Sequence, residues 1–186
     1  GKQKYLTFLK SKSIILKGMA TLTPLKAILR VLQKMMTSYS RLSKDSYFLK
    51  MAYLVGERST CRRRKVGCVL VDSSSHVVAT GYNGVPTHFP HCLDEPCEGA
   101  YASSGFSLEK CLAVHAEQNA FLQLRSDDIL TAYLTVTPCI TCAKILANSK
   151  VSRIVAREPY VQSLATQILE RAKIKVEIHD VDSNRT

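Results

Sequence analysis

Four side chains between residues 115 and 142 have the types and spacing of a hydrolytic zinc centre. Cys139 and Cys142 are three positions apart, so at the start of a helix they lie on one face and can bind one ion. His115 offers a third ligand from another element, which leaves the fourth position of a tetrahedral Zn²⁺ open for water. Glu117 follows the histidine closely enough to move protons at that position. The pattern predicts a metal-activated water beside a carboxylate.

The two thiols alone have other interpretations. A Cys-x-x-Cys pair also occurs in redox proteins and as half of a structural zinc site. The chain has no Cys-Gly-Pro-Cys sequence to support the redox interpretation. His-x-Glu followed by Pro-Cys-x-x-Cys, with a strand-like run between them, favours the zinc centre.

The elements that must position these residues follow from hydrophobic periodicity and turn signals. We expect a helix to about Arg58 with Ser43 or Asp45 as its cap, and three more helices near the site and the C-terminus. The later helices are predicted over His115–Arg125, Cys139–Asn148 and Val161–Ala172. The strands are predicted over Val66–Val71, His76–Thr80, Thr131–Val136, Val151–Ala156 and Ile174–Ile178.

The last strands are joined through a helix, so they should be parallel with a right-handed crossover. The order of elements predicts an α/β fold with three α/β/α layers around a five-stranded mixed sheet. Within a regular helix, His115 and Glu117 would point about 200° apart. We therefore expect His115 at the cap of its helix, from where both side chains reach the metal.

Length and charge divide the 186 residues into two parts. Residues 1–44 contain ten Lys or Arg and no acid, and residues 45–186 contain 16 basic and 15 acidic residues. We expect one catalytic domain over 45–186 and a basic extension over 1–44, with a helix from Pro24 to Lys34. The extension is a solvated arm, a targeting segment, or upstream sequence that precedes Met35 and Met36.

The same composition bounds the partners and the compartment. The formal charge of +11 comes almost entirely from the extension, so the near-neutral body argues against a nucleic-acid-binding surface. No apolar run approaches the ~18 residues that span a bilayer, so no membrane partner is expected. Seven cysteines without a clear signal peptide favour a reducing compartment, and we expect a cytoplasmic protein.

The remaining cysteines suggest a second, structural zinc. Residues 85–114 show no clean period, and a connection of this length needs something to order it. Cys68 lies in a buried-strand run and is expected to pack in the core. The other four thiols are the candidate ligands, and His91 could replace one of them: Cys61, Cys92, Cys97 and Cys111.

From about Ser43 to Asp180 the chain resembles deoxycytidylate (dCMP) deaminases of the phage and bacterial competence-operon type. The resemblance rests on the zinc pattern and on five further segments, Ser59-Thr60-Cys61, Lys65-Val66-Gly67, Gly81-Tyr82-Asn83-Gly84, His115-Ala116-Glu117-Gln118-Asn119-Ala120 and Glu158-Pro159-Tyr160. The Gly-Tyr-Asn-Gly segment and the cysteine-rich insertion separate this group from free-nucleoside cytidine deaminases and tRNA adenosine deaminases.

The resemblance implies a cytidine-deaminase-like fold and hydrolysis of dCMP to dUMP. By it, Glu117 moves the protons, Asn83 contacts the sugar, the Ala116 N–H binds the cytosine carbonyl, and Tyr160 lies near the nucleotide. Two of these residues also have purely structural interpretations. Asn83 could be an ordinary turn residue, and Tyr160 could merely precede a helix.

Four successive cations, Arg62, Arg63, Arg64 and Lys65, precede a buried strand. They could bind the 5′-phosphate or form a solvated charge run. The resemblance also implies a second zinc, a hexamer, and regulation by dCTP and by dTTP with Mg²⁺. The segment matched to that regulation is Gly81, Tyr82, Asn83 and Gly84.

Other functions remain open from the sequence. A polynucleotide or tRNA deaminase could use the basic extension as a docking element. Deamination of dCTP is a further alternative. A zinc-stabilised binding module would need Glu117 to be incidental.

Overall fold

The computed structural model describes residues 27–32, 41–103, 106–160 and 162–180. Residues 27–32 are helical, within the helix expected between Pro24 and Lys34; the rest of that prediction lies outside the described residues. Leu42–Asn184 forms a separate compact unit, which contains the sheet and the site. A search of the described helices for one that could span a membrane finds none.

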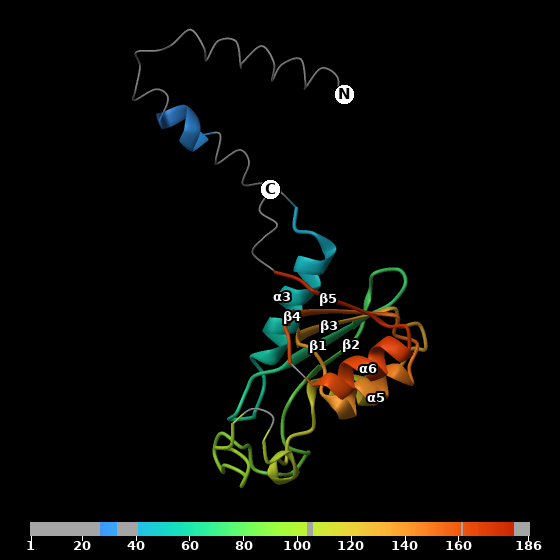
Figure 1. The fold of residues 1–186 in the computed structure, drawn as a ribbon. Coiled ribbons are helices and arrows are strands. Elements are labelled where there is room, and N and C mark those ends of the chain that lie inside the picture. Colours follow the sequence, from blue (N-terminus) through green and yellow to red (C-terminus); the bar gives the residue numbers. More distant parts are fainter. Residues whose placement is uncertain (1–26, 33–40, 104–105, 161, 181–186) are drawn as a thin grey trace. The chain divides into compact units, whose positions relative to one another are not determined.

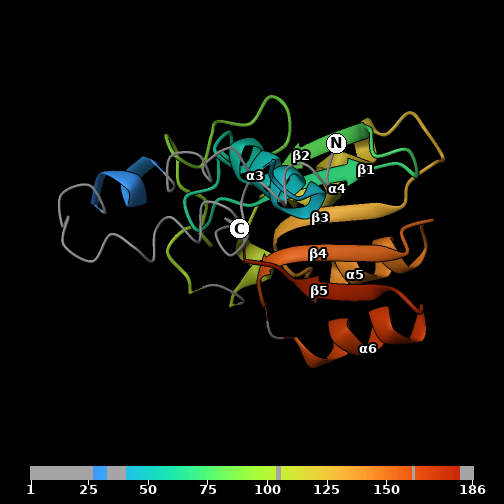
Figure 2. The same ribbon diagram turned by 90° about the horizontal axis from the view of Figure 1, so that it is seen from above.

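Five strands form one mixed sheet, and Figure 2 shows them side by side in the order β2-β1-β3-β4-β5. β1 is antiparallel to β2 and β3, whereas β3, β4 and β5 are parallel to one another. The predicted sheet is confirmed, including its parallel last strands. The bounds are β1 Gly67–Val71, β2 Val77–Tyr82, β3 Thr131–Val136, β4 Arg153–Glu158 and β5 Lys175–Ile178.

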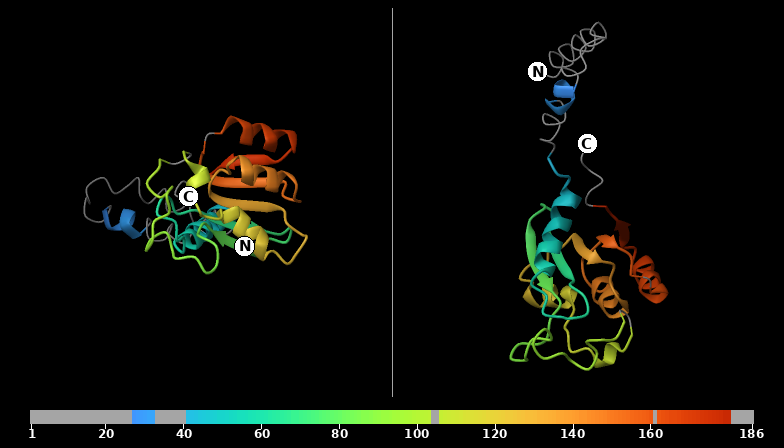
Figure 3. Two further views of the ribbon diagram at one scale, coloured as in Figure 1. Left: turned by 90° about the horizontal axis from the view of Figure 1, so that it is seen from below. Right: turned by 90° about the vertical axis from the view of Figure 1, so that its left-hand side faces the viewer.

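Helices cover both faces of the sheet and complete the predicted three layers (Figures 1 and 3). The helix α3, Lys44–Gly56, packs on one face through Phe48, Leu49 and Ala52. The opposite core contains residues of three helices, which are α4 Ala116–Gln123, α5 Ile140–Ala147 and α6 Ser163–Arg171. All residues of β1 and β3 are buried, because these central strands have helices on both sides.

Ser43 caps α3, and its hydroxyl accepts the backbone N–H of Ser46 at 3.1 Å. Of the two caps that the sequence allowed, the structure therefore uses the serine. The carboxylate of Asp45 instead accepts two hydrogen bonds from Arg153 at the start of β4, each at 2.8 Å. This pair ties the first turn of α3 to the sheet.

The strand β2 is longer than expected from the sequence, since Gly81 and Tyr82 belong to it. A Cβ atom on Gly81 would lie 2.1 Å from the carbonyl oxygen of Ala116 and 2.4 Å from the nitrogen of Ala120. Glycine is required because α4 lies directly against the strand at this point. The close contact fixes the start of α4, where two residues of the predicted site lie.

Candidate metal centre

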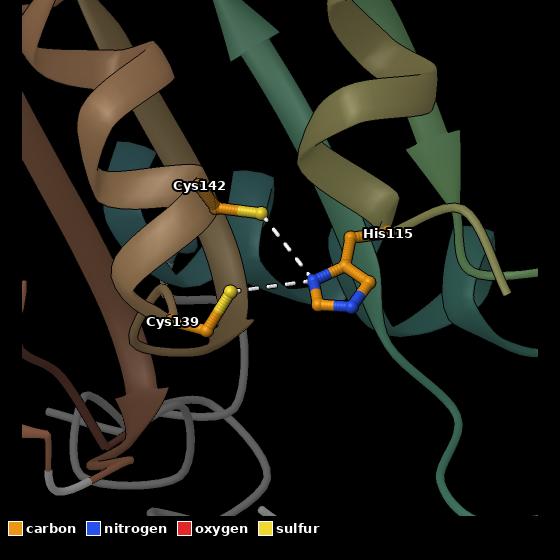
Figure 4. A group of neighbouring side chains, drawn as sticks. All are labelled: His115, Cys139 and Cys142. Atoms are coloured by element: carbon orange, nitrogen blue, oxygen red, sulfur yellow. Dashed lines mark hydrogen bonds between the residues drawn. The ribbon is translucent and has the colours of Figure 1, made fainter. Parts of the chain in front are cut away.

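His115 and Cys139 occupy the same place on two helices. Each is the N-cap of its helix, with an extended backbone, and Cys142 follows in the first turn of α5. The cap position predicted for His115 is confirmed. Figure 4 shows the histidine ring facing both sulfur atoms, with Nδ1 3.4 Å from the Sγ of Cys139 and 3.4 Å from that of Cys142.

These distances fit a shared zinc ion. Zn–S bonds of about 2.3 Å and Zn–N bonds of about 2.0–2.1 Å place N and S about 3.6 Å apart around a tetrahedral ion. Within the described part of the chain, these three residues form a group of potential metal ligands, and their ligand atoms lie within 4.8 Å of one another. One nitrogen and two sulfurs leave a fourth position for water.

Two glutamines hold the caps in place. The backbone N–H of His115 donates to Oε1 of Gln118 at 2.8 Å, and the backbone N–H of Ile140, next to Cys139, donates to Oε1 of Gln162 at 2.8 Å. We did not assign a role to either glutamine from the sequence. The spacing of His115 and Gln118 is that of a capping box and could have indicated the first; nothing local indicates the second.

The electrostatics of the site suit a metal and a proton carrier. The hydrogen bond between the two thiols, together with His115, lowers the pKa of Cys139 to about 4. The same hydrogen bond and burial raise the pKa of Cys142. The hydrogen bond with Cys139 also raises the pKa of His115. Glu117 is 4% exposed, and burial raises the pKa of its carboxyl. A thiolate is the ligand form of cysteine, and a buried carboxyl with a raised pKa can both hold and release a proton.

A cavity of about 110 Å³ joins these residues to several others expected at the site. The predicted residues that line it are His115, Ala116, Glu117, Cys139, Asn83, Tyr160, Arg63, Arg64, Cys61 and Cys111. They come from the two helix starts, the end of β2, the loop before β1, the insertion and the segment after β4. The cavity therefore brings metal-binding groups, an acid–base carboxyl and two arginines together.

The structure separates the four successive cations. Arg63 and Arg64 line the cavity, and Arg64 also pairs with Glu158 at 2.6 Å. The guanidinium of Arg62 lies over the ring of Tyr101, 5.4 Å from its centre. Lys65 forms an ion pair with Glu57. The nitrogen Nη2 of Arg63 donates to the carbonyls of Ser103 at 2.6 Å and Phe106 at 2.9 Å. Its Nη1 is buried and has no hydrogen-bond partner among the described residues, which leaves it a donor for a ligand.

The four cysteines of the predicted second site are only partly brought together. The sulfurs of Cys92 and Cys97 lie 3.8 Å apart. Cys61 and Cys111 both line the catalytic cavity. His91 is exposed and lies 4.0 Å from the carboxylate of Asp94. The insertion that carries most of these residues contains a short 3₁₀ helix, Leu108–Lys110, and a bridge between Gly84 and Val114.

The Gly-Tyr-Asn-Gly segment divides between two cavities. Asn83 lines the catalytic cavity, whereas Tyr82 and Gly84 line a second, more polar one of about 360 Å³. Two histidines of the insertion and two residues of α4 also line the second cavity: His88, His91, Asn119 and Gln123. Neighbouring residues of one segment therefore form the walls of both cavities.

Three known proteins show what this chain is similar to. Deoxycytidylate deaminase of Saccharomyces cerevisiae is 37% identical over 148 residues, which are 77% of this chain and 47% of the yeast protein. Deoxycytidylate deaminase of Mycobacterium phage D29 is 39% identical over 62% of this chain and 95% of its own length. A dCMP deaminase structure from the cyanophage S-TIM5, solved in complex with dCMP and dUMP, has a TM-score of 0.59 and 28% identity over 72% of this chain and 94% of that one.

This chain spans about half the length of the yeast protein. The family model for the zinc-binding region of cytidine and deoxycytidylate deaminases matches residues 42–158, which contain all the residues gathered at the metal centre. The chain belongs to the cytidine and deoxycytidylate deaminase family.

Proposed function

We propose that this chain hydrolyses dCMP to dUMP and ammonia, with Zn²⁺ bound by His115, Cys139 and Cys142. The observation that carries the proposal is a three-ligand metal centre beside a buried carboxyl, in a cavity that also contains two arginines. Two of the similar proteins are named deoxycytidylate deaminases, and a third was solved with dCMP and dUMP. The arginines favour a phosphorylated substrate over a free nucleoside.

Zn²⁺ at this centre supplies the Lewis acid that makes water a nucleophile near neutral pH. Glu117 accepts a proton from the water that attacks C4 of the cytosine and passes it to N3. It then accepts the second proton of that water, from the hydroxyl group now on C4, and gives it to the departing amine, so that water and dCMP give dUMP and ammonia. The backbone N–H of Ala116 donates to the cytosine carbonyl, and Tyr160 closes the nucleotide side of the cavity.

Of the four cations that the sequence offered as phosphate ligands, we propose that Arg63 and Arg64 bind the 5′-phosphate. Both line the cavity, and Arg63 has a buried nitrogen with no partner among the residues that the structure describes. Arg62 and Lys65 are engaged with Tyr101 and Glu57. Because a bidentate guanidinium matches the geometry of a phosphate, two arginines here would distinguish a nucleotide from a nucleoside.

A second, structural Zn²⁺ bound by Cys61, Cys92, Cys97 and Cys111 is also part of the proposal, with His91 as a possible replacement ligand. Two sulfurs on one tetrahedral zinc lie about 3.8 Å apart, and the sulfurs of Cys92 and Cys97 have that separation. Cys61 and Cys111 share the wall of one cavity, which supports their being neighbours. Such an ion would tie the insertion to the loop before β1.

For regulation we propose the second cavity as the site of dCTP, or of dTTP with Mg²⁺, since Tyr82 and Gly84 line it. The proposal also includes a homo-hexamer, a catalytic domain over 45–186 and a basic extension over 1–44 that is an arm, a targeting segment or upstream sequence. A zinc centre with two cysteine ligands needs reduced thiols, which supports a reducing compartment such as the cytoplasm.

A substrate panel tests the proposed function. The zinc-loaded full chain is assayed with dCMP, dCTP, CMP and deoxycytidine, and with single-stranded DNA and tRNA, in the presence and absence of dTTP. We expect the highest kcat/KM with dCMP. A preference for dCTP or for a polynucleotide would reject dCMP as the substrate, and no turnover of any cytosine compound would leave a zinc-stabilised binding module.

A further inference from the structure

The side chain of Asn83 is bonded to the protein on both sides of its amide. Its Oδ1 accepts the backbone N–H of Val66 at 2.8 Å and the hydroxyl of Ser59 at 2.7 Å. Its Nδ2 donates to the carbonyl of Arg64 at 2.7 Å. A rotated amide would place its NH₂ group against the N–H of Val66 and its oxygen against the carbonyl of Arg64, so these contacts fix its orientation. The end of β2 is thereby joined to the loop between α3 and β1.

Ser59 is a buried residue in contact with Asn83 at this junction. It is 4% exposed, and it does not belong to the described residues that line either cavity. Its hydroxyl donates to Asn83, where Oδ1 lies at 2.7 Å and the backbone carbonyl oxygen at 2.9 Å, and it accepts the backbone N–H of Cys61 at 3.2 Å. One hydroxyl thus orients the amide of Asn83 and also holds the start of the loop.

The loop that Ser59 holds forms the cationic wall of the catalytic cavity. Arg63 and Arg64 line that cavity, and the carbonyl of Arg64 is the one bonded to Asn83. The chain before and after the arginines is therefore tied to Asn83, at Ser59 and at Val66. Small displacements of this loop move both guanidinium groups relative to the metal centre.

We propose that Ser59 is a positioning residue that sets Arg63 and Arg64 for the 5′-phosphate, and so determines the preference for a nucleotide over a nucleoside. The inference rests on the proposed function. The hydroxyl acts through Asn83 and the loop and touches no reacting atom. Its loss should affect the phosphate end of the substrate and leave the metal centre intact.

The test compares Ser59→Ala with Ser46→Ala in the zinc-loaded full chain. Ser46 is a matched control, because it is also a buried serine and its hydroxyl forms a hydrogen bond with Nε2 of His179 at 3.0 Å, outside the catalytic cavity. We expect Ser59→Ala to raise KM for dCMP about 5–10-fold, which is the effect of weakening one charge-assisted hydrogen bond. The kcat for dCMP and the kcat/KM for deoxycytidine should stay within about twofold of the values for the unchanged protein. Ser46→Ala should leave the ratio of the two substrates unchanged, and Ser59→Thr, which keeps the hydroxyl, should restore it in part.

Binding of dUMP and deoxyuridine, measured by calorimetry on the same variants, separates the two proposals. Ser59→Ala should weaken dUMP binding selectively. Equal losses for both ligands or both substrates, or no loss, would overturn the positioning role. Selective binding of dUMP that depends on Ser59, without turnover of dCMP, would contradict only the proposed function. Equal binding of dUMP and deoxyuridine by the unchanged protein would overturn the positioning role.

Discussion

The backbone N–H of His115 donates to the side-chain oxygen of Gln118 at 2.8 Å, one helical turn further along α4. This bond holds His115 in an extended conformation, with a ψ of 158°, at the cap of the helix. Its ring can then face the two cysteines while Glu117, inside the first turn, points into the same cavity. Two residues that a regular helix would direct apart thus reach one site.

Gln118→Ala should therefore weaken zinc binding. Loss of the group that orients a metal-binding histidine typically costs 10–100-fold in metal affinity, and we expect about 10-fold here. Competition with a chromophoric chelator measures the affinity, and Gln123→Ala at the other end of α4 is the control. An unchanged zinc affinity in Gln118→Ala would show that the bond has no role in orienting the ligand.

Glu117→Gln should retain zinc and lose turnover. The substitution keeps the size of the buried side chain but removes the group that carries protons, so kcat should fall by about 10²–10⁴-fold. Zinc content and dCMP turnover are measured on the same sample. Turnover close to that of the unchanged protein would refute the proton-transfer role.

Replacing Arg63 or Arg64 by Ala should raise KM for dCMP more than for deoxycytidine, since both line the cavity. An increase of about 10-fold corresponds to the loss of one charge-assisted hydrogen bond to phosphate. Arg62→Ala and Lys65→Ala are the controls, because these two cations contact Tyr101 and Glu57 and are not among the described residues that line the cavity. Equal effects on both substrates would reject the phosphate assignment.

Asp45→Asn should destabilise the fold near neutral pH. The guanidinium of Arg153 lowers the pKa of Asp45 below its ordinary value of 3.8. The ionised carboxylate therefore stabilises the folded state at pH values above 3.8. This stabilisation is lost as the pH falls through the lower pKa that Asp45 has in the folded state. The side chains are 27% and 31% exposed, so we expect about 1–2 kcal/mol at pH 7.

Denaturant unfolding at pH 7 and below pH 3 measures this difference in the free energy of unfolding. Asp127→Asn is the control, since its carboxylate is 96% exposed. The two variants should converge at low pH. A destabilisation of Asp45→Asn that persists unchanged at low pH would mean that packing, and not the charge, accounts for it.

Metal analysis of the purified full chain should give two zinc ions per chain, and Cys92→Ser should give one. The reason is that the sulfurs of Cys92 and Cys97 have the separation of two ligands on one ion. One zinc in the unchanged chain would leave the four cysteines as packing residues or free thiols.

The sheet and the helices around the site could be predicted because their signals are local. β1 is a nearly continuous apolar run, and the cap of α4 follows from the need to bring His115 and Glu117 together. The length of β2 could not be predicted, because Gly81 has turn chemistry in sequence and its role, close contact with α4, depends on packing.

The long-range contacts of the site could not be predicted from the sequence either. The sequence treats Arg62, Arg63, Arg64 and Lys65 alike, and only contacts with distant residues separate the cavity-lining pair from the others. Gln162 supports the start of α5 from 22 residues away. No periodicity or turn signal contains such information.

The most direct test of the central claim is deamination of dCMP by the full chain before and after zinc removal. The account predicts that zinc-loaded protein releases dUMP and ammonia in equal amounts, that a chelator abolishes the reaction, and that added Zn²⁺ restores it. Zinc-loaded, folded protein that produces no dUMP, or turnover that persists after complete removal of zinc, would contradict it.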